Sequence, residues 1–478
     1  EANSNNHLLS TTSSFFVPSM IRIEVINPKM ICQYSVTVIS HRRYTGTATL
    51  LRTQEAPVPR QTFSWEPIFP GEYEILVHEI DTNRHNDPTY ETPLISPPFP
   101  ILVRESEDVV HGITAAAVEG GEGVVVTGTS LLEDRIQNAI PCQLQQMNNV
   151  DIYSQWDGDW LGPDFKLPNK IRTGWTFVPS PKMNCKLETF SHNELQNIPK
   201  KKKIFVLGSS ILRGVFLSMV DLLLGRREKE MLMQSVIGKC WGRAKVSKGN
   251  LELMYQDFRS KNFEDPLDPP YITCHNDKLA REPGTTLIAN ATAVWEEIFH
   301  QEDESEWPSV IYLLAGNFGR FWFGREKNGH YPSTKPKWEN QVKWFVDNLP
   351  PTWRGTLFLN DNSFSARKGG LASMKDYESY LQEIHDLSRK LNDPRVRWID
   401  GYGIAKEMRM HSEGKENRVA TSQHFHRACN NGDVKNGLMI VCSNVTEMVA
   451  QLLLGHALGP KQDFLMEQEK PKKSPSKK

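Results

Sequence analysis

One serine stands where covalent chemistry is expected. Residues 204–207 predict a buried strand, Gly208, Ser209 and Ser210 a tight turn, and residues 211–224 a helix. Ser210 would then lie at the carboxyl end of a strand and at the positive end of a helix, where negative charge is stabilised. A serine in that position can act as a nucleophile that forms an acyl intermediate. An N-cap serine at an ordinary strand-to-helix turn is the alternative interpretation.

The turn also resembles a known motif. Residues 208–213 read Gly-Ser-Ser-Ile-Leu-Arg and are similar to the Gly-Asp-Ser-x-x-Arg motif of the PC-esterase family, a branch of the SGNH/GDSL hydrolases. Ser210 matches the nucleophile and Arg213 the arginine, whereas Ser209 stands where the family has aspartate. The resemblance covers about residues 142–458. It is closest to animal proteins that join an immunoglobulin-like or cadherin-like module to a PC-esterase domain.

This resemblance implies a histidine base near the C-terminal end of the domain. The family signature there is Asp-x-x-His, often followed by an aromatic residue, and His424 with Phe425 matches its end; His426 is the second candidate. Thr421 stands at the aspartate position, and a threonine cannot stabilise an imidazolium by charge. Loss of that carboxylate costs a chymotrypsin-like triad about four orders of magnitude in turnover. Asp400, at the end of a predicted strand, could supply a carboxylate from another loop, or it could simply cap a turn.

The resemblance also implies three donors to an oxyanion: the nucleophile's own N–H, a glycine and an asparagine. Asn317 follows the apolar run 310–314 and matches the asparagine, and Gly238 is the candidate glycine. One such side-chain donor typically contributes about 2.7–4 kcal/mol in the transition state. A turn stabilised by an Asx hydrogen bond is the alternative for Asn317.

Two function classes follow. The first is an O-acyl esterase or O-acetyltransferase that acts on a glycan, glycoconjugate or acylated small molecule, without a metal or other cofactor. The second is a catalytically inactive PC-esterase-like module that binds glycan or protein, because Ser209 and Thr421 replace both family aspartates.

Length, charge and apolar content bear on two further function classes, nucleic-acid binding and membrane proteins. The chain has 478 residues, with 56 Lys and Arg against 57 Asp and Glu. Its length allows two or more domains, and its near-neutral charge gives no general field for nucleic acid. The longest apolar stretch, residues 204–224, contains Arg213 and Asp221 and is therefore expected to be a buried strand and helix. The first residues are polar and resemble no signal peptide. Because the chain begins with Glu1, we expect a fragment or processed chain, with a membrane anchor upstream left open.

The cysteines favour an oxidising compartment. Seven are present, none in a Cys-x-x-Cys pair, so a zinc site is not expected. Sequons at Asn290 and Asn444 add to the expectation of a secreted protein or one in the Golgi or ER lumen. A cytosolic chain with free thiols is the alternative. One arrangement consistent with the spacing is Cys142–Cys185, Cys240–Cys274 and Cys429–Cys442 with Cys32 left over, although the sequence does not determine connectivity.

The hydrophobic periodicity and the positions of Gly and Pro divide the chain into five predicted segments. Short alternating strands with Gly and Pro turns predict an all-β, immunoglobulin-like sandwich, which could make protein contacts. Alternating strands and helices predict an α/β domain: an SGNH-like, mostly parallel sheet with helices on both faces. The predicted segments are a disordered 1–18, the sandwich 19–105, a linker or hairpin 106–141, the PC-esterase/SGNH-like domain 142–458 and a disordered basic tail 459–478.

Aromatic residues cluster just before the predicted nucleophile strand. Trp156, Trp160, Trp175 and Phe177 lie between Cys142 and Cys185. In plant members of the family, a comparable segment is thought to engage polysaccharide. The alternative is that these aromatics are core material that caps the sheet.

Overall fold

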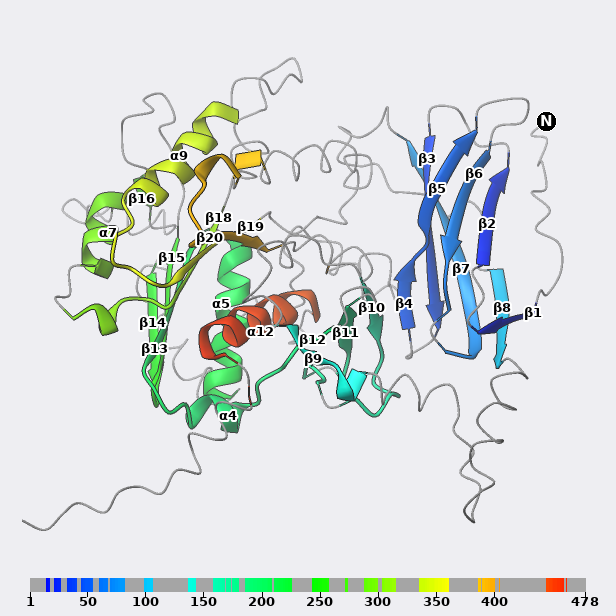
Figure 1. The fold of residues 1–478 in the computed structure, drawn as a ribbon, viewed down its shortest axis with the longest axis horizontal. Coiled ribbons are helices and arrows are strands. Elements are labelled where there is room, and N and C mark those ends of the chain that lie inside the picture. Colours follow the sequence, from blue (N-terminus) through cyan, green and yellow to red (C-terminus); the bar gives the residue numbers. More distant parts are fainter. Residues whose placement is uncertain are drawn as a thin grey trace, which may run out of the picture.

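The computed structural model places an α/β part beside a β-rich N-terminal part, shown at the left and the right of Figure 1. The structure describes residues 14–17, 21–26, 32–40, 44–54, 60–67, 69–81, 99–105, 136–142, 158–167, 169–172, 174–179, 185–208, 210–225, 243–257, 271–273, 288–299, 303–314, 335–360, 386–387, 389–399, 404, 444–459 and 461.

Two sheets form the N-terminal part. The larger has the strand order β1-β8-β7-β3-β4-β10-β11, and the smaller has the order β2-β6-β5. The strands are β1 (Ser14–Val17), β2 (Ile21–Ile26), β3 (Cys32–Ser40), β4 (Tyr44–Thr47), β5 (Thr49–Gln54), β6 (Arg60–Trp65), β7 (Gly71–Asp81), β8 (Phe99–Glu105), β10 (Gly158–Leu161) and β11 (Thr176–Pro179).

Alternating apolar residues from both sheets meet in one core. Ile23 and Phe63 of the smaller sheet are buried with Val36, Tyr73 and Ile101 of the larger sheet. Two sheets that share a core in this way form a β-sandwich. Its immunoglobulin-like relationship stays a prediction.

The structure describes a few residues in the two terminal segments. Ser14–Val17, within the predicted segment 1–18, forms β1 and pairs in parallel with β8, whose backbone groups would otherwise form the open edge of the sheet. Gly459 and Lys461 are the described residues of the predicted tail 459–478. Gly459 ends a helix with φ +82°, and Lys461 donates its backbone N–H to Glu188 over 3.0 Å. Most of the predicted linker 106–141 lies outside the described residues.

A short hairpin, β10 with β11, connects the two parts of the molecule. It extends the sandwich sheet by pairing with β4, and Tyr44 Oη donates to Asp159 Oδ1 over 2.8 Å. Leu161 and Val178 enter the sandwich core. The opposite face carries Trp160 and Phe177, which are 0% and 1% exposed in the core of the α/β part.

The aromatics before the nucleophile strand are therefore core material where the structure describes them. Trp175 is also buried, and Trp160 Nε1 donates to the carbonyl of Ile404 over 2.9 Å. Trp156 lies outside the described residues.

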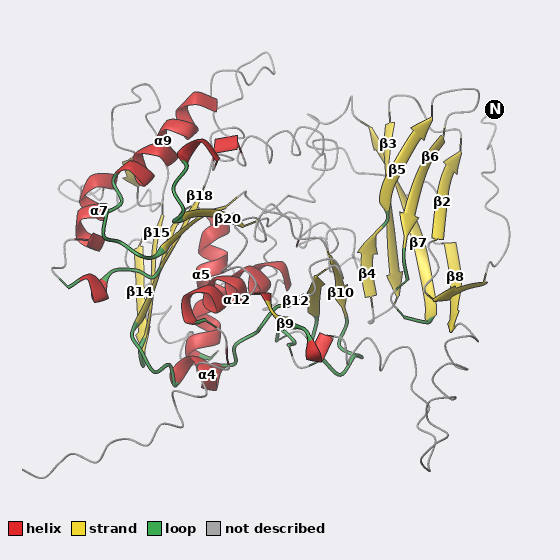
Figure 2. Cartoon of the chain, viewed as in Figure 1, coloured by secondary structure: helices red, strands yellow, loops and turns green. Residues whose placement is uncertain are grey.

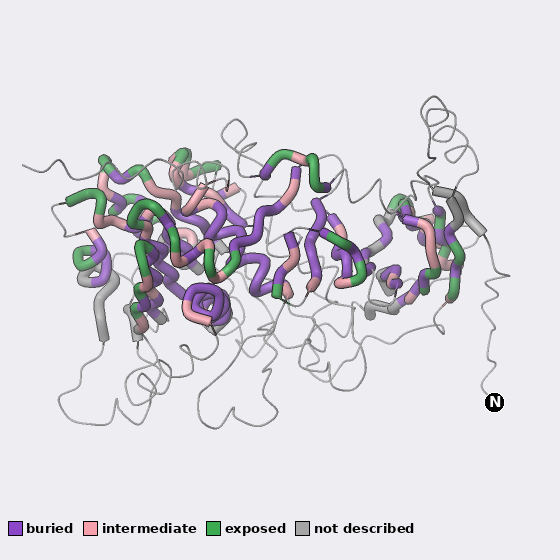
Figure 3. The backbone as a smooth tube through the Cα atoms, turned by 90° about the horizontal axis from the view of Figure 1, so that it is seen from below, coloured by how far each residue is buried: buried purple, intermediate pink, exposed green. Residues whose placement is uncertain are grey.

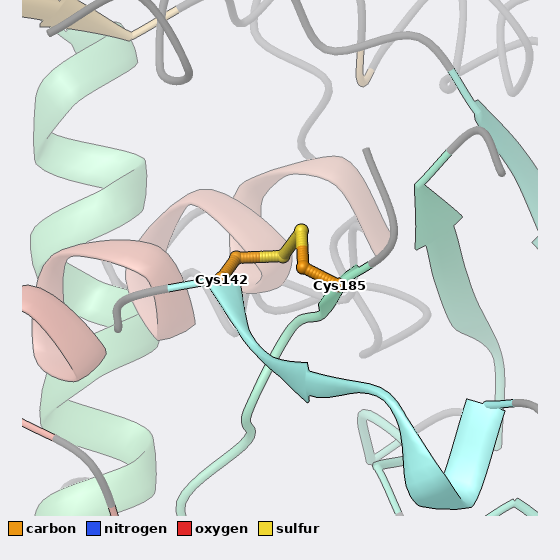
Figure 4. The surroundings of a disulfide bond; sticks show 2 residues. All are labelled: Cys142 and Cys185. Atoms are coloured by element: carbon orange, nitrogen blue, oxygen red, sulfur yellow. A yellow bond between two sulfur atoms is a disulfide. The ribbon is translucent and has the colours of Figure 1, made fainter. Parts of the chain in front are cut away.

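A disulfide cross-links this region. Cys142 and Cys185 are bonded, as the sequence analysis expected, and both are buried (Figure 4). Next to them the short strands β9 (Ile140–Pro141) and β12 (Cys185–Lys186) pair in parallel. The cysteines of the other two expected pairs lie outside the described residues.

A six-stranded sheet forms the centre of the α/β part. Its order is β14-β15-β13-β18-β19-β20, and every pairing except β14 with β15 is parallel. The sheet strands are β13 (Lys202–Gly208), β14 (Arg243–Lys248), β15 (Leu251–Asp257), β18 (Val310–Leu314), β19 (Thr356–Asn360) and β20 (Val396–Ile399). The other elements of this part are β16 (Tyr271–Thr273), β17 (Ile288–Asn290), α4 (His192–Gln196), α5 (Ser210–Leu224), α7 (Ala291–Phe299), η5 (Glu304–Glu306), α9 (Lys335–Asp347) and α12 (Asn444–Leu458).

Helices cover both faces of this sheet, as predicted (Figure 2). In β13, Ile204 and Val206 face a core shared with α5 and α12. Phe205 and Leu207 face a second core, which contains residues of α7 and α9. Because β13 is buried on both faces, it is a continuous apolar run. Buried residues are drawn purple in Figure 3. None of the helices within the described ranges is long and apolar enough to cross a membrane.

Candidate active site

The strand order places Ser210 at a position where ligands bind in this type of fold. If the five parallel strands are numbered along the chain, their order in the sheet is 2-1-3-4-5. The chain connections change from one face to the other between β13, the first, and β18, the third. In open α/β sheets the crevice at such a switch point, outside the carboxyl ends of the strands, is the usual ligand site.

Two elements fix the backbone of Ser210. β13 ends at Gly208, and α5 begins at Ser210, so only Ser209, which lies outside the described residues, separates strand from helix. The first backbone N–H groups of a helix have no partner within it, and the helix dipole adds partial positive charge there. The start of α5 can therefore stabilise negative charge beside the Ser210 backbone.

A buried tyrosine fixes the end of the nucleophile strand. Tyr255 of β15 donates its hydroxyl to the carbonyl oxygen of Gly208 over 3.0 Å. Its ring stacks on Phe216 of α5, with centroids 5.5 Å apart and an interplanar angle of 29°. Sequence reasoning missed Tyr255, because 47 residues separate it from Gly208 and only the sheet order brings them together.

Arg213 lies one turn after Ser210 on α5. Residues three apart lie on the same face of a helix, so Arg213 shares the face of Ser210. It is partly exposed, whereas the preceding Leu212 is completely buried.

The remaining predicted residues are placed only through the strands that precede them. β18 ends at Leu314, three residues before Asn317, and β20 ends at Ile399, directly before Asp400. Both strands are parallel to β13, so they end at the same edge of the sheet as Gly208. Gly238, Asn317, Asp400, Thr421, His424 and His426 themselves lie outside the described residues.

The two sequons lie on regular elements. Asn290 is the last residue of β17, directly before α7, and Asn444 is the first residue of α12. Thr446, the third residue of the second sequon, is buried on α12.

An ion-pair network binds α5 to α12 behind the site. Arg172 Nε lies 3.0 Å from Glu447 Oε2 of α12, and an Arg172 terminal nitrogen lies 3.1 Å from Asp221 Oδ2 of α5. The carboxylate side chains are 1% (Asp221) and 4% (Glu447) exposed. Burial lowers the pKa of Arg172, but the charges of Glu447 and Asp221 outweigh it, and its pKa lies above the usual value. Asp221 is three turns beyond Ser210, roughly 16 Å along the helix axis, so this network is structural.

A second charged cluster lies near the amino ends of the parallel strands, opposite the ends that carry Ser210. Lys203 Nζ lies 2.5 Å from Glu306 and 3.7 Å from Glu252, and Lys201 also pairs with Glu306. Hydrogen bonds from Lys201 and Lys203 lower the pKa of Glu306 to about 2. Lys203 is five residues before the carboxyl end of β13, roughly 16 Å from it, so this cluster is also remote from Ser210.

Comparison with known proteins identifies no family. Neither a protein-family model nor a curated protein matches the chain. Among solved structures, an acetylxylan esterase from Geobacillus stearothermophilus is 10% identical, with a TM-score of 0.28 over 55% of this chain and 97% of that one. A protein described as a GDSL-like lipase from Parabacteroides merdae is 11% identical, with a TM-score of 0.28 over 55% of this chain and 99% of that one.

A protein described as a glycoside hydrolase from Bacteroides vulgatus is 7% identical, with a TM-score of 0.16 over 81% of this chain and 56% of that one. All these TM-scores are below 0.5, so the strand order and the backbone of Ser210 carry the functional argument. Within the described part of the chain, no group of three or more His, Cys, Asp or Glu residues is arranged to hold a metal ion.

Proposed function

We propose that the chain is a serine esterase or O-acyltransferase of the SGNH type, with Ser210 as its nucleophile. One observation carries the proposal: Ser210 begins α5 with a single residue between it and the end of β13, at the switch point of a 2-1-3-4-5 sheet. An ordinary N-cap serine would need no particular strand. Ligands of open α/β sheets bind outside the carboxyl ends of the strands at the switch point, and β13 ends there directly before the turn that carries Ser210.

In this mechanism the Ser210 hydroxyl attacks an acyl carbonyl and His424 accepts its proton, with His426 as the second candidate. The tetrahedral oxyanion receives hydrogen bonds from the Ser210 N–H, the Gly238 N–H and the Asn317 amide. Collapse of this intermediate expels the alcohol, which takes the proton from the histidine, and leaves an ester on Ser210. Water or an acceptor hydroxyl then releases the acyl group.

Arg213 and Asp400 have supporting roles in the proposal. Arg213 shares a helix face with Ser210, and β20 ends directly before Asp400 at the nucleophile edge of the sheet. A carboxylate at Asp400 would stabilise the imidazolium that Thr421 cannot stabilise. The proposed route uses no metal or cofactor.

The proposed substrate is an acylated glycan or glycoconjugate met in the secretory pathway. The buried Cys142–Cys185 disulfide supports an oxidising compartment, because disulfides are rare in the cytosol. The sequons at Asn290 and Asn444 agree with that location. Protein contacts through the β-sandwich are part of the same proposal.

A fluorophosphonate probe with peptide mapping tests the nucleophile directly, because it reacts with activated serines. We expect the label on Ser210, and we expect hydrolysis of an activated acetyl ester to fall to the uncatalysed rate in Ser210→Ala. Ser209→Ala is the matched control, since it removes the adjacent hydroxyl. Equal ester hydrolysis by the unmodified protein and Ser210→Ala would exclude the enzyme.

A second candidate is a glycan-binding module without catalysis. The observation that favours it is the replacement of both family aspartates, by Ser209 and Thr421. For each of two ligands, acetylated and deacetylated polysaccharide, the unmodified protein and Ser210→Ala would then bind with the same affinity. Neither protein would release acetate. Acetate release that is lost in Ser210→Ala would exclude this candidate.

A further inference from the structure

Tyr255 contacts both elements that flank the nucleophile turn. Its hydroxyl donates to the carbonyl oxygen of Gly208, the last residue of β13, over 3.0 Å. Its ring stacks on Phe216, six residues after the start of α5. A single buried side chain therefore connects the end of the strand to the helix that begins with Ser210.

The hydrogen bond has structural consequences because its surroundings are dry. Tyr255 is 2% exposed and Gly208 is buried, so water cannot replace the hydroxyl without rearrangement. A buried carbonyl that loses its donor either stays unsatisfied or turns toward another donor. A change in the direction of the Gly208 carbonyl would be transmitted to Ser210, because only one residue lies between them.

We propose that Tyr255 is a positioning residue for the Ser210 nucleophile: its hydroxyl sets the end of β13 and its ring sets the start of α5. This inference rests on the proposed function. It assigns no contact with substrate to Tyr255, which acts through the backbone of Gly208 and the side chain of Phe216.

The test uses Tyr255→Phe in the full chain, which keeps the ring and removes only the hydroxyl. Tyr312→Phe is the matched control. Tyr312 lies on the other neighbour of β13, opposite the same residue, Val206, and it is buried in the same core. The readouts are the rate of fluorophosphonate labelling at Ser210, kcat and KM for an activated acetyl ester, and the thermal midpoint.

We expect Tyr255→Phe to lower kcat and the labelling rate about 10- to 100-fold, since misplacement of a reacting group by about 1 Å can cost 10²-fold. KM should change little, because the substrate contacts are untouched. Tyr312→Phe should lower the thermal midpoint without that loss of rate. If Tyr255→Phe does not fold, Phe216→Leu carries the same test through the ring contact.

The outcomes separate this inference from the function on which it rests. If the unmodified protein is not labelled at Ser210, the proposed function fails. If the unmodified protein is labelled and Tyr255→Phe reacts at the same rate, the function stands and the role of Tyr255 is refuted. Equal rate losses in Tyr255→Phe and Tyr312→Phe would also refute it, because the effect would then be general loosening of the core.

Discussion

His456, in the last turn of α12, makes the stability of the α/β part depend on pH. Its Nε2 lies 2.9 Å from Thr356 Oγ1, and its ring packs edge-on against Phe358 of β19. Burial, followed by the charges of Arg397 and Lys202, lowers the pKa of His456 from 6.5 to about 4. The side chain is therefore neutral in the folded protein over a pH range in which the unfolded chain binds a proton.

The sign and size of the effect follow from these two pKa values. Between pH 6.5 and about 4 the unfolded state binds more protons, so the free energy of unfolding falls as the pH falls. Each pKa unit is worth about 1.4 kcal/mol, so the loss attributable to His456 reaches about 3 kcal/mol at the lower end of that range. Above pH 6.5 both states are neutral at this residue and the contribution is constant.

His456→Gln removes the titrating group and leaves an amide that can still bond to Thr356. On acidification from about pH 7 to about pH 4 we expect the variant to lose about 3 kcal/mol less stability than the unmodified protein. The carboxylate of Glu306, with its pKa lowered to about 2, also loses its contribution as the pH falls below 4.5. That loss is the same in both proteins and cancels in the comparison.

Urea unfolding followed by far-UV circular dichroism measures the difference. The helices α4, α5, α7, α9 and α12 belong to the α/β part, so loss of helical signal follows the unfolding of that part. Thr356→Val is the control: it removes the hydrogen-bond partner of His456 but keeps its burial, so the pH dependence should persist. Parallel pH profiles for His456→Gln and the unmodified protein would refute the reasoning, as would greater acid sensitivity in the variant.

The two remaining predictions concern the supports of the fold. Arg172→Met should lower the free energy of unfolding by about 3–5 kcal/mol in urea unfolding, because Asp221 and Glu447 are left as buried charges without their cation. A triple variant that adds Asp221→Asn and Glu447→Gln removes those charges and should recover much of the loss. A triple variant as unstable as Arg172→Met would contradict this account. Replacing Cys142 and Cys185 by serine should cost up to about 4 kcal/mol, since the bond closes a loop with a separation of 43 residues, and an unchanged thermal midpoint would contradict it.

Four of the five parallel strands of the α/β part could be predicted because each has a largely buried apolar run, whereas β15, between β14 and β13, was missed. The apolar runs 204–207, 310–314, 356–359 and 396–399 correspond to β13, β18, β19 and β20. β14 was missed as well. It is an edge strand in which Lys245 and Ser247 are exposed, and its sequence has no apolar run.

The contacts around the nucleophile could not be predicted in the same way. The turn after β13 has a local signature, a strand that ends in glycine before a serine and a helix. Neither Tyr255 nor Arg172 has one. Tyr255 reaches Gly208 because β15 lies beside β13, and Arg172 reaches Glu447 across 275 residues. Such contacts depend on how distant elements pack together, which the local sequence does not encode.

The hairpin of β10 and β11 links the sandwich to α5, the helix that begins at the proposed nucleophile. By hydrogen bonding, β10 and β11 belong to the sandwich sheet, yet Trp160 and Phe177 lie in the core that contains α5 and α12. The segment between these strands carries Arg172, which holds both helices through Asp221 and Glu447.

A boundary at residue 142 would therefore separate β10 from β4 and expose Leu161 and Val178, which are buried in the sandwich core. The strands that complete the sandwich also support α5, the helix that begins at Ser210. The two parts are thus structurally coupled through the hairpin and its contacts with α5 and α12.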